Sequence, residues 1–128
     1  MNYADNSFDL IYGISVFTHL DEEYQDSWLK ELRRIAKPEA TIILSVHGDF
    51  CINRLPESRQ KEVRSKGFGY MEGATGWLKL DKLPDFYQTS FHTEDYVRQH
   101  WTKYFDITDY VVRGINNHQD AVILKVKE

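Results

Sequence analysis

The chain has 128 residues, of which 41% are hydrophobic and 28% are charged, and it contains only seven glycines and three prolines. This composition predicts one globular domain with a hydrophobic core of its own, and it excludes a disordered or fibrous chain. Sixteen Lys and Arg residues against twenty Asp and Glu residues give a net charge of -4, which argues against binding to nucleic acids.

The cysteine content and the length of the apolar runs indicate the cellular setting. A single cysteine, Cys51, excludes a disulfide framework and zinc sites built on thiolates. No apolar run approaches the roughly 20 residues that a membrane span needs, and the first seven residues do not resemble a signal peptide. We therefore expect a soluble, cytoplasmic protein that does not bind membranes.

The first predicted elements are a strand and a helix. The strand runs from Phe8 to Ile14 and is apolar almost throughout, a pattern typical of a parallel strand covered on both faces. Asp21 can cap the helix that follows, and Pro38 cannot continue it beyond Ala36. Apolar residues recur every three or four positions and predict its buried face, which comprises Tyr24, Trp28, Leu29, Leu32, Ile35 and Ala36.

A second β-branched run, from Thr41 to Val46, completes a strand, helix and strand unit. The crossover in such a unit is right-handed and its two strands are parallel. Residues 13–19 and 47–49 would then lie together beyond the carboxyl ends of the strands. Open α/β sheets bind their ligands at that edge, so we expect the functional site there.

The remainder of the chain divides into an insertion, a helix and a hairpin. The insertion, at about 49–90, contains a short helix behind Pro56 and three aromatic residues that favour a lid or binding segment, Trp77, Phe86 and Tyr87. Thr93 should cap the next helix. Strands from Phe105 to Arg113 and from Ala121 to Val126 flank a turn-rich connector and predict an antiparallel hairpin.

These elements, in this order, resemble a known family. The tract from Phe8 to Leu20, which reads FDLIYGISVFTHL, the amphipathic helix ending at Pro38 and the strand after it resemble the second half of class I S-adenosylmethionine (SAM)-dependent methyltransferases. The resemblance implies an α/β, partial Rossmann-like fold. It would contain two parallel strands, a C-terminal antiparallel hairpin and flanking helices, with the insertion on the acceptor side.

One part of the family pattern is missing. The family binds its cofactor with a strand, a Gly-rich loop and a helix, but only seven residues precede the first strand here. The resemblance therefore implies that residues 1–128 form the C-terminal part of a methyltransferase domain. The complete protein would transfer a methyl group from SAM to a small-molecule acceptor, and this chain would be inactive alone.

The resemblance also implies roles for residues at the strand ends. Gly13, Ile14, Ser15 and Phe17 would line the methionine end of SAM, with backbone carbonyls facing its positive charges. His19 would act as the base when the acceptor must lose a proton, since an imidazole titrates near neutral pH. The alternative is that His19 only forms a hydrogen bond to the backbone at the turn into the helix.

Residues for the acceptor are less specifically indicated. His47 ends the second strand and could face the acceptor together with Trp77, Phe86 and Tyr87, although a structural role fits each of them as well. The other histidines, His92, His100 and His118, share no spacing that suggests a metal site, and we expect none.

Two rival functions fit parts of the sequence. Residues 13–17 approach the Gly-x-Ser-x-Gly elbow of Ser hydrolases, with Ser15 as nucleophile, but Phe17 replaces the last glycine. The second rival is a non-catalytic interaction module. Without the first half of the domain, the strand from Phe8 to Ile14 would expose an apolar edge, through which the chain would self-associate or bind a partner chain.

Overall fold

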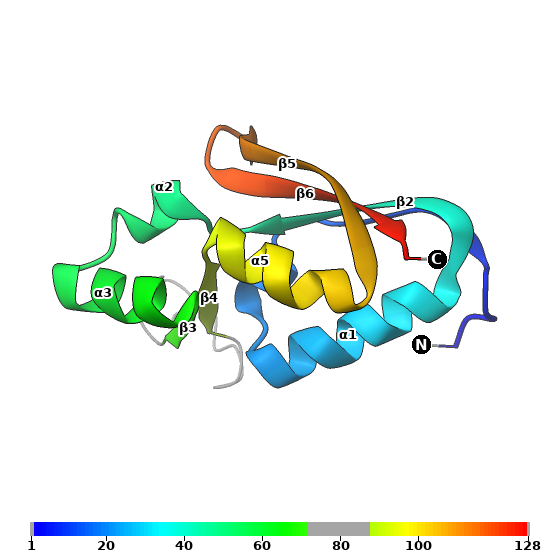
Figure 1. Cartoon of the computed structure of the whole chain (residues 1–128), viewed down its shortest axis with the longest axis horizontal. Coiled ribbons are helices and arrows are strands. Elements are labelled where there is room, and N and C mark those ends of the chain that lie inside the picture. Colours follow the sequence, from blue (N-terminus) through cyan, green and yellow to red (C-terminus); the bar gives the residue numbers. More distant parts are fainter. Residues whose placement is uncertain (1, 72–87, 128) are drawn as a thin grey trace.

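A four-stranded sheet is the centre of the fold (Figure 1). The computed structural model describes residues 2–71 and 88–127. In these ranges the main sheet has the strand order β1-β2-β6-β5, and a second sheet pairs β3 with β4. The strands are β1 (Phe8–Gly13), β2 (Ala36–Val46), β3 (Phe68–Met71), β4 (Thr89–His92), β5 (Phe105–Ile115) and β6 (Gln119–Val126).

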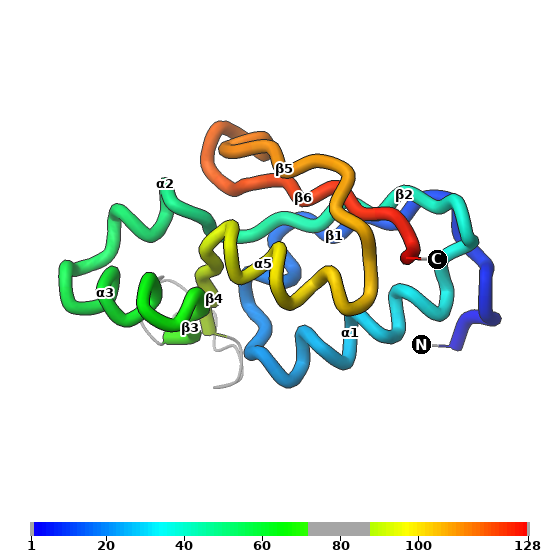
Figure 2. Tube along the Cα trace, in the orientation of Figure 1, coloured from blue at the N-terminus to red at the C-terminus, as the bar shows by residue number. Residues whose placement is uncertain are grey.

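The helices lie in two groups. Below the main sheet in Figure 1 lie α1 (Glu22–Ile35) and α5 (Glu94–His100), whereas α2 (Asp49–Ile52) and α3 (Glu57–Lys66) lie beside the small sheet at the far end. The short helices η1 (Phe17–His19) and η2 (Trp101–Lys103) precede α1 and follow α5. Both termini of the described chain lie at the end opposite to α3 (Figure 2). None of the helices in the described ranges is long and apolar enough to cross a membrane.

The predicted strand, helix and strand unit is confirmed. β1 and β2 are parallel, and Tyr12 pairs with Ile43 in their register. The Asp21 carboxylate accepts a hydrogen bond of 2.8 Å from the backbone N–H of Tyr24 and so caps α1. The helix ends at Ile35, and β2 begins directly at Ala36.

The prediction that β1 is covered on both faces is wrong. Leu10 is 55% exposed and Tyr12 70% exposed, and β1 is an edge strand of the sheet. The reason is that α1 and α5 pack against one face only, the face to which Ile42 and Leu44 of β2 contribute. The exposed side of β1 is consequently apolar, which bears on the function proposed below.

The predicted buried face of α1 needs a correction. Tyr24 is 51% exposed and Trp28 37% exposed, and Gln25 is buried in their place beside Leu29. The Gln25 amide nitrogen donates hydrogen bonds to the carbonyls of Phe17 (3.2 Å) and Leu20 (2.8 Å). A polar residue turns inward here because it binds these carbonyls of the η1 turn, a requirement that a hydrophobic pattern does not reveal.

The insertion and the C-terminal region follow the prediction in outline. The helix behind Pro56 is α3, and Gly67 ends it with a φ of 82°, in the left-handed region. Thr93 caps α5, and β5 and β6 form the predicted antiparallel hairpin, whose turn contains Asn116 and Asn117 at positive φ. The small sheet of β3 and β4 was not predicted. The aromatic residues Trp77, Phe86 and Tyr87 lie outside the described residues.

We predict that Gln25→Ala destabilises the protein by about 2–3 kcal/mol, since the Leu20 carbonyl and the fully buried His92 ring would lose their hydrogen bonds to the Gln25 side chain. Chemical denaturation of the chain measures this loss. The matched control is Gln99→Ala, which removes the side chain of an exposed residue and should change the free energy of unfolding by less than about 0.5 kcal/mol. Equal stabilities of the two variants would contradict the role assigned to Gln25.

Candidate functional site at the ends of β1 and β2

The ends of β1 and β2 meet, as the sequence predicts. Gly13 pairs with Leu44, and the backbone N–H of Ser15 donates a hydrogen bond of 2.8 Å to the hydroxyl of Ser45 at the end of β2. The Ser15 hydroxyl in turn accepts a hydrogen bond of 2.9 Å from the side-chain amide of Gln119. Three strands thus contribute to one polar edge.

The backbone of this edge has an unusual conformation. Ser15 has a φ of 60°, which costs a residue other than glycine roughly 1 kcal/mol or more. Its two hydrogen bonds offset that cost and fix the turn that leaves β1. The hydroxyl of Ser15 lies beside an amide, which is not a base, and this contact gives no support to the Ser hydrolase alternative.

The other predicted cofactor residues differ in exposure. Ile14 is 39% exposed beyond the end of β1. A Cβ atom at Gly13 would lie 3.1 Å from a methyl carbon of Leu44, so the small residue allows the close packing at this position. Phe17 is buried in the core against Trp101, and its carbonyl accepts hydrogen bonds from Gln25 and, at 2.6 Å, from the Ser90 hydroxyl. Its side chain therefore anchors the turn.

His19 lies at the end of η1 and is largely buried. Its Nδ1 atom is 2.9 Å from the carbonyl oxygen of Gln88. A carbonyl can only accept, so Nδ1 carries the proton, and in the neutral ring Nε2 carries the lone pair. A general base needs such a lone pair. The same hydrogen bond also fits the structural role that the sequence leaves open.

His47 follows β2 directly and is buried. Its Nδ1 atom is 3.0 Å from the carbonyl oxygen of Ser90, so this ring has the same tautomer as that of His19. Burial, opposed by the hydrogen bond to Ser90, lowers the pKa of His47 to about 4. The ring is therefore neutral at physiological pH. Its edge-on neighbour is His118, with ring centroids 5.9 Å apart.

Two polar residues that the sequence did not place in the site connect it to the small sheet. Ser90 of β4 binds Phe17 through its hydroxyl and His47 through its carbonyl. His92 is fully buried, and its Nε2 atom donates a hydrogen bond of 2.7 Å to the carbonyl oxygen of the Gln25 side chain. The only sequence signal was that these polar residues alternate with Thr89 and Phe91 in a short run without charges.

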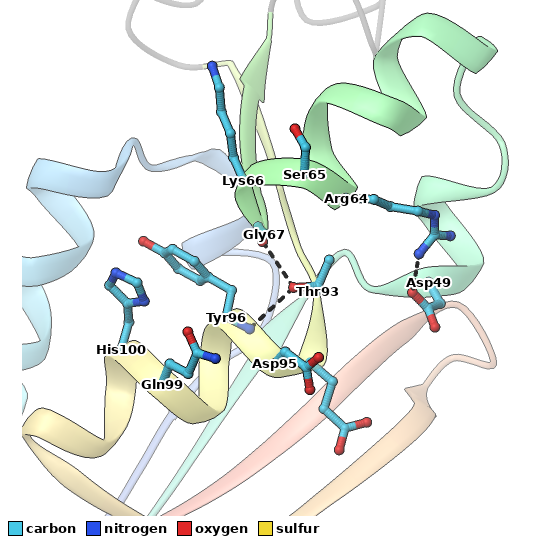
Figure 3. A pocket seen from close by; sticks show the side chains of 11 residues that line it. Asp49, Arg64, Ser65, Lys66, Gly67, Thr93, Asp95, Tyr96, Gln99 and His100 are labelled. Atoms are coloured by element: carbon cyan, nitrogen blue, oxygen red, sulfur yellow. Dashed lines mark hydrogen bonds and ion pairs between the residues drawn. The ribbon is translucent and has the colours of Figure 1, made fainter.

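A larger cavity lies away from these residues. It has a volume of about 640 Å³ and is formed by the end of α3 and the start of α5 (Figure 3). Its charged groups include Asp49 and Arg64, which form an ion pair of 2.9 Å. Thr93 in its wall accepts a hydrogen bond from the backbone N–H of Tyr96 and donates one to the Gly67 carbonyl. None of the predicted site residues in the described ranges lines this cavity.

Comparisons with known proteins indicate the same fold as the sequence. Residues 1–44, from the N-terminus into β2, match the family described as a methyltransferase domain. A SAM-dependent methyltransferase from Methanosarcina mazei superimposes with a TM-score of 0.60 at 22% identity. The glycopeptide N-methyltransferase MtfA, crystallised with sinefungin, gives a TM-score of 0.58 at 12% identity. The chain has a class I methyltransferase fold. The resemblance stated from the sequence is thereby confirmed.

The methyltransferase fold extends over nearly all of this chain but only part of the similar structures. The match with the Methanosarcina mazei protein covers 100% of this chain and 64% of that one, and the match with MtfA covers 94% and 58%. A chain of the complex between the Haloferax volcanii Trm112 methyltransferase activator and a methyltransferase gives a TM-score of 0.61 at 10% identity and covers 100% and 58%. The chain thus spans about three fifths of their lengths. No curated protein sequence matches it.

We predict that the methyltransferase fold becomes less stable as the pH falls from about 6.5 towards 3, in part through His92. Burial lowers the pKa of His92 to about 3, whereas an unfolded histidine has a pKa near 6.5. Between these values the unfolded state binds more protons, so lowering the pH favours unfolding. His92→Gln should reduce the slope of the unfolding free energy against pH, measured by denaturation at several pH values. Gln99→Ala, which alters no titratable group, should leave the slope unchanged, and an unchanged slope in His92→Gln would refute the prediction.

Proposed function

We propose that this chain forms the C-terminal part of a SAM-dependent methyltransferase domain, which in the complete protein transfers a methyl group to a small-molecule acceptor. The observation that carries this proposal is the meeting of the β1 and β2 ends in a methyltransferase fold. Ligands of open α/β sheets bind at this edge. MtfA, which has a similar fold, was crystallised with the ligand sinefungin, and this supports the proposal that the fold binds a ligand.

In this proposal the turn after β1 forms one wall of the cofactor site. Gly13, Ile14 and Ser15 would face the methionine end of SAM, and Phe17 would hold the turn in place from the core. The hydrogen bonds of Ser15 to Ser45 and Gln119 support the role, because they fix the backbone before any ligand binds. Methyl transfer is an in-line displacement, in which such positioning supplies much of the rate.

The two histidines at this edge would serve the acceptor. His19 would remove its proton, since the hydrogen bond to Gln88 leaves the lone pair on Nε2. His47, which is neutral because burial lowers its pKa, would face the acceptor. The proposal extends to the lid function of Trp77, Phe86 and Tyr87, which lie outside the described residues.

The apolar edge supports a second proposal, that another polypeptide docks on β1. Leu10 and Tyr12 lie on the exposed edge and, with Trp28 of α1, line an apolar groove of about 390 Å³. An unpaired edge strand with apolar side chains favours the addition of a further strand. We propose that the remainder of the methyltransferase domain binds here in the complete protein, and that a second copy binds here when the chain is alone.

We predict that His19→Ala in the complete domain lowers kcat by about 10²-fold or more, because proton removal from the acceptor would lose its base. The affinity for S-adenosylhomocysteine, measured by calorimetry, should stay nearly the same, since His19 is assigned to the acceptor. His100→Ala, at the end of α5, is the matched control and should retain the wild-type kcat. An unaltered kcat in His19→Ala would leave His19 with its structural role only.

We predict that the isolated 128-residue chain self-associates at micromolar concentration and that Leu10→Lys combined with Tyr12→Lys makes it monomeric. Charges on the edge would oppose strand addition and the burial of the groove. Light scattering measures the mass of each form. Val112→Lys alters an exposed apolar residue on β5, the opposite edge, and should not change the association. A monomeric wild-type chain would contradict this assignment of the edge.

A further inference from the structure

Three possible metal ligands come together beside the candidate site. His47 follows β2, Cys51 lies in α2, and His118 lies in the turn between β5 and β6. One donor atom of each residue lies within 4.8 Å of the donor atoms of the other two. The Sγ atom of Cys51 is 3.7 Å from Nε2 and 3.8 Å from Nδ1 of His118. Two imidazoles and a thiol thus converge from three separate elements.

The separation of Cys51 and His118 is close to that of two ligands in a tetrahedral zinc site. Zinc binds sulfur at about 2.3 Å and imidazole nitrogen at about 2.0–2.1 Å, which places two such ligands about 3.5 Å apart at a tetrahedral angle. The contact between Cys51 and His118 is only slightly longer than this value. The donor atoms of all three residues lie within 4.8 Å of one another, so side-chain movements on the order of 1 Å would bring them to bonding distance.

The orientation of His47 is also suitable for a metal ligand. Its Nδ1 atom donates to the carbonyl oxygen of Ser90, so the lone pair of Nε2 is available to an ion. Metal-binding histidines commonly have their second nitrogen fixed in this way, which sets the tautomer and the direction of the ring. Ser90 is itself fully buried and is held by its hydrogen bond to Phe17.

Space for an ion and a further ligand exists at this position. A cavity of about 330 Å³ is lined by all three residues and by Arg54, Leu55, Thr89 and Phe91. Zinc sites with three protein ligands keep the fourth position for water or a substrate. The cavity therefore has room for a zinc site whose fourth position is taken by water or a substrate, as well as for a structural site with protein ligands only.

Against the expectation from the sequence that the chain has no metal site, we propose that His47, Cys51 and His118 bind a zinc ion whose fourth position is open to water or to an acceptor group. Binding converts the thiol of Cys51 to a thiolate and releases its proton to solvent. The ion would connect β2, α2 and the β5–β6 turn, and would add stability to the folded state. This inference does not rest on the proposed methyl transfer, because it concerns ligands that the fold alone brings together.

The alternative is that the three residues form a hydrogen-bonded cluster without an ion. The Cys51 thiol lies 3.7 Å from the His118 carbonyl oxygen and could donate its proton there or to the imidazole. Such a cluster would bind zinc no more tightly than any exposed histidine does. Affinity and the identity of the donor atoms therefore distinguish the two cases.

The test uses the 128-residue chain, freed of metals by a chelator and titrated with Zn²⁺ in a calorimeter. We expect one ion per chain with micromolar or tighter affinity, and a loss of at least 10-fold in Cys51→Ser and in His118→Gln. His100→Gln removes a histidine outside the cluster and is the matched control, for which we expect the wild-type affinity. Equal binding by all four proteins, or no binding by the wild type, would overturn the proposal.

A spectroscopic measurement covers the case in which a variant does not fold. Titration of the wild-type chain with Co²⁺ should produce a thiolate-to-cobalt absorption band together with the visible bands of tetrahedral cobalt. Because the chain contains a single cysteine, the thiolate band can come only from Cys51. Cobalt binding without that band would show that the ion sits elsewhere and would refute the assignment. The readout needs no cofactor, so its failure is separate from a failure of the proposed methyltransferase function.

Discussion

Hydrogen bonds to one buried strand, β4, hold the candidate site together. The Ser90 hydroxyl binds the carbonyl of Phe17, the Ser90 carbonyl binds the ring of His47, and the backbone N–H of His92 binds the carbonyl of His47. His92 and Gln25 complete the connection to α1. All four residues of β4 are buried, and residues that follow β1 and β2 supply partners for both polar groups of Ser90 and for the backbone N–H of His92. The insertion is therefore part of the site.

β1 is an edge strand with exposed apolar side chains. A parallel α/β sheet is usually covered on both faces, but Leu10 and Tyr12 are exposed here while the face against α1 is packed. The chain also spans only about three fifths of the similar methyltransferase structures. An apolar edge and an incomplete covering of the sheet are both what a partial domain would have. These two observations are the basis for proposing that another polypeptide completes the domain.

The proposed cofactor wall and the proposed zinc ligands lie close together but depend on different parts of the fold. The turn that contains Ser15 is set by the pairing of β1, β2 and β6. The zinc ligands depend on the path of the chain after β2, because α2 brings Cys51 back towards His47 and the hairpin turn brings His118. An ion at that position would lie beside the predicted acceptor end of the site. It could orient an acceptor without contacting the cofactor wall.

The sequence by itself determined the local elements and their order. The cap at Asp21, the stop before Pro38 and the turn before Gln119 depend on short-range chemistry, and the parallel pairing of β1 with β2 follows from the helical connection between them. The tertiary structure decided what the periodicity could not. Gln25 replaced Tyr24 in the buried face because buried carbonyls needed a donor. The tertiary structure also brought Cys51 within 3.7 Å of His118, which is 67 residues away in the sequence. The count of cysteines and the spacing of histidines could not predict that contact. Clusters of this kind form when segments that are distant in the sequence pack together, so the spacing of their residues along the chain does not predict them.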